Sequence, residues 1–352
     1  MSKFAATCVL TACIFLVAGC LSTSVPQVDR EEVTSALYDQ RKLAVDLYLE
    51  RLVKVNELAL PILRANNEIC NEVSGHRIGV TILTKRSLPF NLQKAAEDEF
   101  GIGSRPVIYI TPGTPAANSE LRSGDRLYRI NDTNIGDNLW SRNTAHNVLK
   151  DALKEGEDVT LRVMRRGSHD QIVSVLTPEP MCQSFVYLIQ DPLPNAFADG
   201  QDIFVYTGLL KEAENDHEVQ VVLAHELAHN AMSHVAKSGR IGLVGSVLEA
   251  LIFDEDDDAD GVISDLAVLT FSPSFEREAD YVGIYMLARA GLDTESAATF
   301  WRRLAVEYPE ENQRTLLATH PIHTERFLRM EKAHQEIVEK MEDGSPLIPE
   351  AR

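Results

Sequence analysis

The stretch VLAHELAHNAMSH, Val222–His234, constrains the fold more than any other part of the chain. His225 and His229 are four residues apart, so on an α-helix their side chains lie on one face and can bind a single Zn²⁺ ion. Glu226 follows the first histidine, where it can accept a proton from a water molecule at the metal. The spacing therefore predicts a helix that carries part of a zinc site. Two histidines that only share a helix face are the alternative.

A second helix has to supply what this motif lacks. A catalytic zinc site needs a third protein ligand and keeps one position open for water. In SFEREADYVG, Ser274–Gly283, Glu276 and Asp280 again lie four residues apart on one helix face, so one can bind the metal while the other supports it. Glu278 is the alternative third ligand, although it would point elsewhere on the helix.

HELAH followed about fifty residues later by E-x-x-A-D resembles the signature of metallopeptidase family 48. That family of gluzincins includes the CAAX prenyl proteases and bacterial envelope quality-control proteases. The resemblance implies that His225, His229 and Glu276 bind one Zn²⁺ per chain. It also implies that Glu226 is the catalytic base and that Asp280 orients a ligand.

Two further stretches resemble the same family. His320, in a His-Pro pair, and Arg326 are similar to its late HP…R element. This similarity implies that both are catalytic residues near the zinc and that His320 stabilises the oxyanion or gates the open position. Asn195, Ala196 and Phe197 resemble its substrate strand, an edge strand that would hold an extended chain by main-chain hydrogen bonds. A surface histidine and an ordinary hairpin turn are the alternatives.

Between about 76 and 178 the periodicity changes to that of strands and turns. The run ITPGTPAANSELRSGDRLYRIND, 110–132, closely resembles the core of a PDZ domain, with its proline-glycine turn and its Leu-x-x-Gly-Asp strand entry. We expect the loop Phe100–Gly103 to hold a peptide carboxylate, and the resemblance implies that client C-termini add as an extra strand. A purely structural PDZ fold is the alternative.

Five cysteines divide between two parts of the chain, because Cys8, Cys13 and Cys20 precede the folded body. Cys70 and Cys182 bracket the PDZ-like unit. Two cysteines in an exported chain suggest one disulfide, which would clip the base of an inserted domain.

The first twenty residues read as a targeting segment. An apolar run over 4–18 ends in Leu-Val-Ala-Gly-Cys20, which resembles a bacterial lipobox. The resemblance implies lipidation of Cys20 and a lipid anchor in the cell envelope, at the periplasmic face of the outer membrane if the source is Gram-negative. A plain signal peptide is the alternative.

Charge limits the partners and suggests one more site. The net charge of −19 repels nucleic acid, which we therefore exclude as a partner. Asp256, Asp258 and Asp260 fit the opening of a Ca²⁺-binding EF-hand loop, but Ala267 stands where a bidentate Glu belongs. A solvated acidic loop is therefore favoured over a calcium site.

The remaining periodicity predicts further elements. A helical segment over 29–72 should pack on a neighbouring domain, with Pro61 kinking or dividing it. Asp216 is the expected N-cap of the HELAH helix. Strands are predicted at 107–110, 126–130, 159–165, 185–189 and 203–207, and helices at 144–154, 216–233, 274–290, 296–306 and 323–340.

These features predict an α+β fold. We expect a mainly helical gluzincin metalloprotease core with a small antiparallel sheet, plus an inserted PDZ-like β-rich domain. The expected function is a zinc-dependent endopeptidase of the cell envelope that cleaves unfolded or misassembled proteins. The alternative is a lipid-anchored chaperone or assembly factor with a latent or vestigial metal site. The expected segments are 1–20 (signal peptide), 21–75 (N-terminal helical), 76–180 (PDZ-like), 181–341 (catalytic) and 342–352 (tail).

Overall fold

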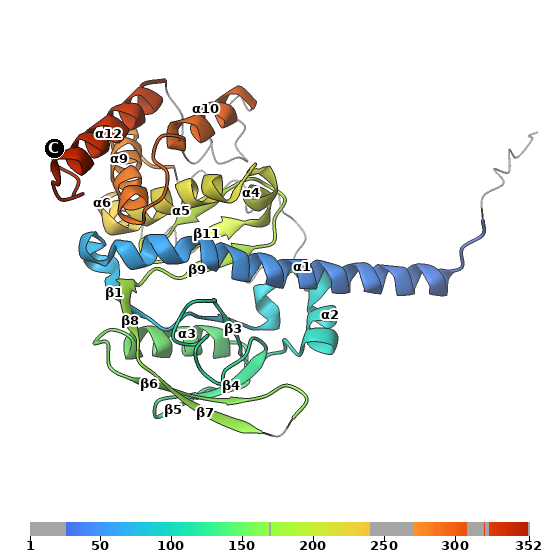
Figure 1. Cartoon of the computed structure of the whole chain (residues 1–352). Helices are drawn as coiled ribbons and strands as arrows, with labels where there is room; N and C mark the ends of the chain where they lie inside the picture. Colours follow the sequence, from blue (N-terminus) through green and yellow to red (C-terminus); the bar gives the residue numbers. More distant parts are fainter. Residues whose placement is uncertain (1–25, 169, 240–269, 308–319, 321–323, 351–352) are drawn as a thin grey trace, which may run out of the picture.

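The structure is a computed structural model, and it describes residues 26–168, 170–239, 270–307, 320 and 324–350. Figure 1 shows two lobes on opposite sides of one long helix, α1 (Arg30–Ala65). A helical lobe lies on one side of α1, and a β-rich lobe lies on the other. Together they give the predicted α+β fold, with a helical core and a PDZ-like unit.

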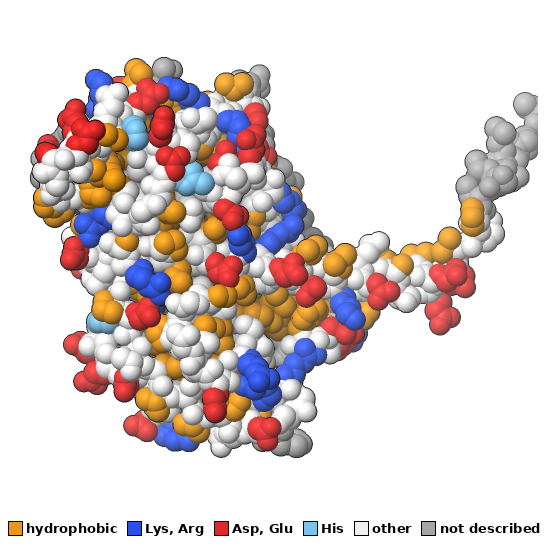
Figure 2. Space-filling model, viewed as in Figure 1, with side chains coloured by type: hydrophobic (Ala, Val, Ile, Leu, Met, Phe, Trp, Pro, Cys, Tyr) orange, Lys and Arg blue, Asp and Glu red, His pale blue; other side chains and the backbone are white. Residues whose placement is uncertain are grey.

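Helix α1 begins in a capping box, in which the Asp29 side chain accepts a hydrogen bond from Glu32 N at 2.8 Å and Asp29 N donates to Glu32 Oε2 at 2.9 Å. From Val45 onward one face is buried in the body. The N-terminal half projects from the body and leaves side chains such as Val33 and Leu37 exposed (Figure 2). The expectation that Pro61 divides the helix is wrong, because the buried turn that follows it continues to Ala65.

The PDZ-like lobe is built on an antiparallel sheet in the order β2-β3-β4-β6-β7. Within it, β6 buries every second residue, as expected for a strand with one face on a core. Among the described residues β2 is an edge strand, and α3 packs close to it. The elements are β2 (Val80–Leu83), α2 (Phe90–Phe100), β3 (Val107–Ile110), β4 (Asp125–Ile130), β5 (Thr133–Asn134), α3 (Ser141–Ala152), β6 (Val159–Met164) and β7 (Gln171–Leu176).

A covalent clip closes the base of this lobe. The chain enters through the short 3₁₀ turns η1 (Asn67–Ile69) and η2 (Asn71–Val73) and strand β1 (Ser74–Arg77), and leaves through β8 (Glu179–Cys182), which pairs antiparallel with β1. Cys70 and Cys182 form a disulfide with a Cα–Cα distance of 5.7 Å. The polypeptide chain therefore enters and leaves this lobe at one place.

The helical lobe contains a three-stranded sheet in the order β10-β11-β9. Strand β11 pairs antiparallel with β10 but parallel with β9, so this small sheet is mixed. The reason is the path of the chain, which runs back along β10 before it enters the central position as β11. The elements of this lobe are β9 (Val186–Ile189), β10 (Ala196–Ala198), β11 (Ile203–Tyr206), α4 (Thr207–Glu212), α5 (Asp216–Ala231), α6 (His234–Lys237), α9 (Pro273–Arg289), α10 (Ala297–Glu307) and α12 (Thr324–Asp343).

Helices α5 and α9 form the centre of the helical lobe. Gly283 on α9 permits their close approach, because a Cβ atom there would lie 3.3 Å from the backbone of Ala224 and from His225 Cα. Small residues therefore set the distance between the two helices that carry the predicted metal ligands.

Several predictions fall on parts of the chain that the structure does not describe. The targeting segment with Cys20 lies outside the described residues, and so does the acidic stretch with Asp256, Asp258 and Asp260. Within the described part of the chain, no helix combines the length and the apolar character needed to cross a bilayer.

Candidate metal centre

The HELAH motif lies on the C-terminal half of α5, a helix buried on nearly all sides. Its N-cap is Asn215, whose side chain accepts a hydrogen bond from Glu218 N at 3.1 Å, so the prediction of Asp216 as the cap is wrong by one residue. Asp216 instead occupies the first turn. His225, Glu226 and His229 face the interior of the lobe and are buried.

The ligand atoms of His225, His229, Glu276 and His320 all lie within 4.8 Å of one another. His225 Nε2 is 3.1 Å from His229 Nε2 and 3.4 Å from Glu276 Oε2, and His229 Nε2 is 3.6 Å from Glu276 Oε1. Zinc bonds of about 2.0–2.2 Å in a tetrahedron separate neighbouring ligand atoms by roughly 3.3–3.6 Å. The spacing of these nitrogen and oxygen atoms therefore fits a zinc ion.

His320 stands at the remaining corner of this cluster. Its Nδ1 lies 3.1 Å from His225 Nε2 and 3.1 Å from Glu276 Oε1. Its Nε2 lies 3.2 Å from Glu226 Oε1. The sequence placed His320 near the metal, and the structure brings it to the position that a catalytic zinc site keeps open.

Glu226 has the surroundings of a reacting group. Its side chain is fully buried, yet within the described residues no well-aligned hydrogen bond reaches either carboxylate oxygen. His320 Nε2 lies 3.2 Å from Oε1 but is not aligned for a hydrogen bond, so this buried carboxylate has capacity for a further partner. A water molecule held beside the metal would be such a partner.

Asp280 and Arg326 lie behind the ligands. Asp280 Oδ1 is 3.1 Å from His225 Nδ1, and Arg326 makes two hydrogen bonds to Asp280, of 2.7 and 2.8 Å. Arg326 also lies 3.2 Å from Glu276 Oε2 and donates to the His320 carbonyl at 3.2 Å. The resemblance to the family groups Arg326 with the catalytic residues. In the structure, Arg326 holds carboxylates and the His320 backbone in place.

The charges around the ligands favour a cation. Three carboxylates and one guanidinium surround the ligands, so the centre carries two negative charges when its histidines are neutral, the form that binds a metal, and a divalent ion would balance them. Burial alone would lower the pKa of His320, but the carboxylates of Glu276 and Glu226 overcome this effect and raise that pKa to about 10. Burial likewise opposes ionisation of Glu276, yet the neighbouring histidines hold its pKa well below the ordinary value.

Sequence reasoning missed the role of His234. No motif assigns a role to this histidine, but its Nδ1 lies 2.9 Å from His229 Nδ1. Glu278, the alternative third ligand, does not reach the cluster and instead lies 3.0 Å from His234 Nε2. A histidine five residues after HELAH is the only signal in the sequence that could have indicated this contact.

The predicted substrate strand has the expected position. In β10, Ala196–Ala198, the chain pairs with β11 on one side, and no second partner strand occurs among the described residues. The strand packs next to α5, and the Phe197 ring stacks on Phe204 with 5.0 Å between centroids. Asn195, just before the strand, is buried. One backbone edge of β10 is therefore left for an extended chain, which stays a prediction.

The PDZ-like unit differs from its prediction in one respect. The candidate carboxylate loop, Phe100–Gly103, leads into β3, which already pairs with β2 and β4 on its two sides. A ligand cannot add to a strand that has no free edge, so this loop assignment is wrong. Among the described residues the edge strands of this sheet are β2 and β7, and the loop that enters β2 contains Ile78 and Gly79.

The helix next to that edge, α3, is docked on the helical lobe. His146 Nδ1 lies 2.6 Å from the Tyr187 hydroxyl, and the His146 ring packs edge-on against Phe185 at 4.9 Å between centroids. Lys150 Nζ lies 3.2 Å from Asp202 Oδ1. Arg77, at the end of β1, lies over the Phe185 ring at 4.5 Å from its centroid. The side of α3 that carries His146 and Lys150 therefore faces β9 and the β10–β11 turn.

Comparison with known proteins agrees with this geometry. Residues 165–334 match the model of peptidase family M48, and residues 77–176 match that of the PDZ domain. Two helices that bring an HExxH motif and a glutamate to one cluster have the arrangement expected of a gluzincin metallopeptidase. The chain carries a peptidase domain of family M48 together with a PDZ domain.

Individual relatives come from mitochondria and from bacteria. The chain is 31% identical over 156 residues to the mitochondrial metalloendopeptidase OMA1 of Schizosaccharomyces pombe, which covers 42% of this chain and 45% of that protein. It is 30% identical over 162 residues to the beta-barrel assembly-enhancing protease of Yersinia pestis, which covers 40% of this chain and 32% of that protein. The match thus spans less than half the length of either relative.

Proposed function

We propose that this protein is a zinc-dependent endopeptidase of the cell envelope. The observation that carries the proposal is the spacing of the ligand atoms of His225, His229 and Glu276, 3.1 to 3.6 Å apart, beside the buried carboxylate of Glu226. The match of residues 165–334 to peptidase family M48 supports it.

When bound, zinc would polarise the scissile carbonyl and a water molecule. Glu226 takes a proton from the water as its oxygen bonds to the scissile carbonyl carbon, and later gives that proton to the leaving amine nitrogen as the peptide C–N bond breaks. Once the His320 side chain moves out of the ligand position, it is placed to donate a hydrogen bond to the oxyanion. Asp280 keeps His225 oriented through its Nδ1.

We propose that the substrates are unfolded or misassembled envelope proteins. An unfolded segment can add to the edge of β10 through main-chain hydrogen bonds, which recognise many sequences. The name of the Yersinia pestis relative, a beta-barrel assembly-enhancing protease, supports an envelope role. A lipid anchor at Cys20 belongs to the same proposal and would hold the catalytic lobe near newly exported chains.

The test is cleavage of an unfolded protein by the zinc-loaded chain, compared with its Glu226→Gln variant. Removal of a general base lowers rates by about 10²–10⁴-fold, and the variant should keep its zinc. Glu214→Gln, on an exposed carboxylate outside the centre, is the matched control. Equal cleavage by wild type and Glu226→Gln would refute the proposed mechanism.

A latent metal site is the second candidate, and the position of His320 favours it. With Nδ1 at 3.1 Å from both His225 and Glu276, His320 occupies the fourth corner that water would need. A chaperone or assembly factor would then use the lobe for binding only. If wild type binds zinc but does not cut, and His320→Ala cuts, the chain is a latent protease. If neither cuts, the binding role is favoured.

A further inference from the structure

His234 returns to the metal centre because of a left-handed turn. Helix α5 ends at Ala231, and Ser233 adopts φ 55° and ψ 37°, a conformation that residues other than glycine rarely adopt. In a continuing helix a residue five places after His229 would point away from it. The turn instead brings the His234 ring back, fully buried, to 2.9 Å between the two Nδ1 atoms.

The protons on these two rings follow from their partners. His229 Nε2 faces the ligand cluster, so it must be free of hydrogen to bind a metal, and the ring then carries its proton on Nδ1. His234 Nδ1 has to accept that hydrogen bond. The proton of His234 therefore sits on Nε2, which donates to Glu278 Oε2 at 3.0 Å.

Aromatic packing fixes both rings. Phe271 stacks on His229 at 4.1 Å between centroids with 20° between the planes, and Phe275 stacks on His234 at 4.4 Å with 17°. Neither imidazole can rotate without losing a stacked neighbour. A ring held in its plane keeps the direction of its hydrogen bonds.

On these grounds we propose that His234 and Glu278 form a positioning chain for the metal ligand His229. It is the counterpart of Asp280 and Arg326, which hold His225 from the other side. The inference rests on the proposed function, because it assumes that His229 binds zinc through Nε2. Such partners fix the tautomer and the orientation of a ligand and raise its basicity.

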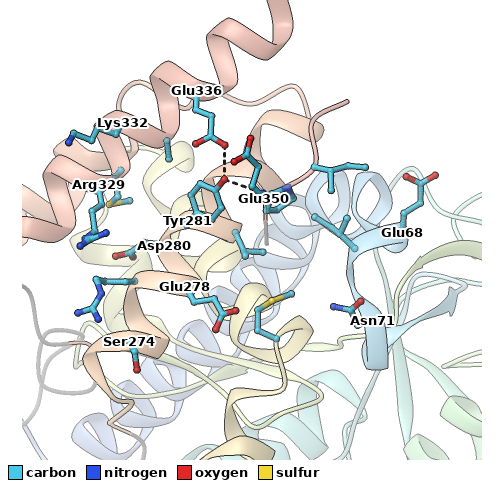
Figure 3. A pocket seen from close by; sticks show the side chains of 18 residues that line it. Glu68, Asn71, Ser274, Glu278, Asp280, Tyr281, Arg329, Lys332, Glu336 and Glu350 are labelled. Atoms are coloured by element: carbon cyan, nitrogen blue, oxygen red, sulfur yellow. Dashed lines mark hydrogen bonds between the residues drawn. The ribbon is translucent and has the colours of Figure 1, made fainter. Parts of the chain in front are cut away.

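The hydrogen-bonded side chains behind His225 and those behind His229 end in different environments. Asp280 is buried with Arg326, whereas the Glu278 side chain is 44% exposed and lines a cavity of about 760 Å³ between α9, α12 and the C-terminal segment. Figure 3 shows Glu278 on α9 among the residues around this cavity, with Tyr281 beyond it. We expect Glu278 to contribute less than His234, because water can replace an exposed carboxylate as the acceptor of the Nε2 proton.

The experiment measures zinc affinity by chelator competition, together with the absorption spectrum of the Co²⁺-loaded chain. His234→Leu removes the acceptor, and we expect its zinc dissociation constant to rise about 10–100-fold and the Co²⁺ bands to shift. His234→Asn keeps an acceptor at the Nδ1 position and should stay within a few-fold of wild type. The zinc dissociation constant of Glu278→Gln should fall between those of the two His234 variants. Glu339→Gln, which changes an exposed carboxylate on α12, should match wild type.

Three results would overturn the inference. If His234→Leu keeps the zinc affinity and the Co²⁺ spectrum of wild type, His234 does not position His229. If His234→Asn binds zinc as weakly as His234→Leu, the hydrogen-bond acceptor at this position is not what matters. If wild type binds no zinc, the proposed function fails and the inference fails with it. Thermal unfolding of the zinc-free variants distinguishes a folding defect from a loss of zinc affinity. If His234→Leu does not fold, the zinc affinities of His234→Asn and Glu278→Gln, compared with that of Glu339→Gln, test the inference.

Discussion

The metal centre and the contact between the two lobes are both made of residues far apart in the sequence. At the centre, α5 and α9 each present residues four positions apart, and the chemistry of zinc dictates which residue types occur. At the contact, α3 meets Phe185, Tyr187 and Asp202 through side chains that belong to no motif. A site with chemical requirements can be predicted from spacing, whereas a docking surface follows from shapes that only the fold creates.

The largest change in stability is expected at the centre. Arg326→Met leaves the carboxylates of Asp280 and Glu276 buried without their guanidinium partner. We expect the free energy of unfolding of the zinc-free chain to fall by about 3–5 kcal/mol. Denaturant unfolding measures it, with the exposed Arg329→Met as the control. A loss below about 1 kcal/mol would show that Arg326 is not needed to hold these carboxylates.

The contact between the lobes should be nearly as sensitive. Phe185→Ala removes a ring packed against Arg77 and His146, and we expect a loss of about 3 kcal/mol. It should also free the edge of β2, so that C-terminal peptides bind the PDZ-like unit more tightly. Fluorescence titration with a peptide library measures this binding, and exposed Val175→Ala is the control. Strong peptide binding by wild type would show that the contact between the lobes does not limit access to the edge of β2.

Removal of zinc tests how the centre contributes to the whole lobe. Because only the folded chain assembles the ligands, zinc at about 100 times its dissociation constant should stabilise the protein by about 2.7 kcal/mol. Calorimetry with and without a chelator measures the shift in Tm. Restoring zinc should restore both Tm and cleavage, while Mg²⁺ should restore neither. An unchanged Tm would argue against a metal in this cluster.

The smallest expected effect lies in the β10–β11 turn. Burial and the charge of Asp202 raise the pKa of Asp199 to about 7. Because this folded-state pKa lies above the unfolded value near 4, stability should be greatest below pH 4 and should fall as the pH rises to about 7. Asp199→Asn keeps an acceptor for the backbone and removes the charge.

Because Asp199 is only half-buried, we expect Asp199→Asn to raise the free energy of unfolding by about 1 kcal/mol at pH 8 and by almost nothing at pH 4. Denaturant unfolding at the two pH values measures the gain. The same gain at both would show that Asp199 does not titrate in this range.

The sequence predicted the parts of the fold that follow from periodicity. The strand at 107–110 and the helices of the catalytic lobe occur within a few residues of their predicted bounds. It did not predict the parallel pairing of β9 with β11, which depends on the path of the chain between them. Helix periodicity could not predict the approach of His234 to His229, because Ser233 breaks the helix between them.

Metal analysis of the full chain, combined with X-ray absorption spectroscopy, tests the central claim most directly. One zinc per chain is predicted, bound by nitrogen and oxygen atoms at about 2.0–2.2 Å, with a signal from at least two imidazoles. Glu276→Gln should weaken the binding and change the oxygen shell. Zinc absent from the wild type, or bound with sulfur or without imidazole, would contradict a centre formed by His225, His229 and Glu276.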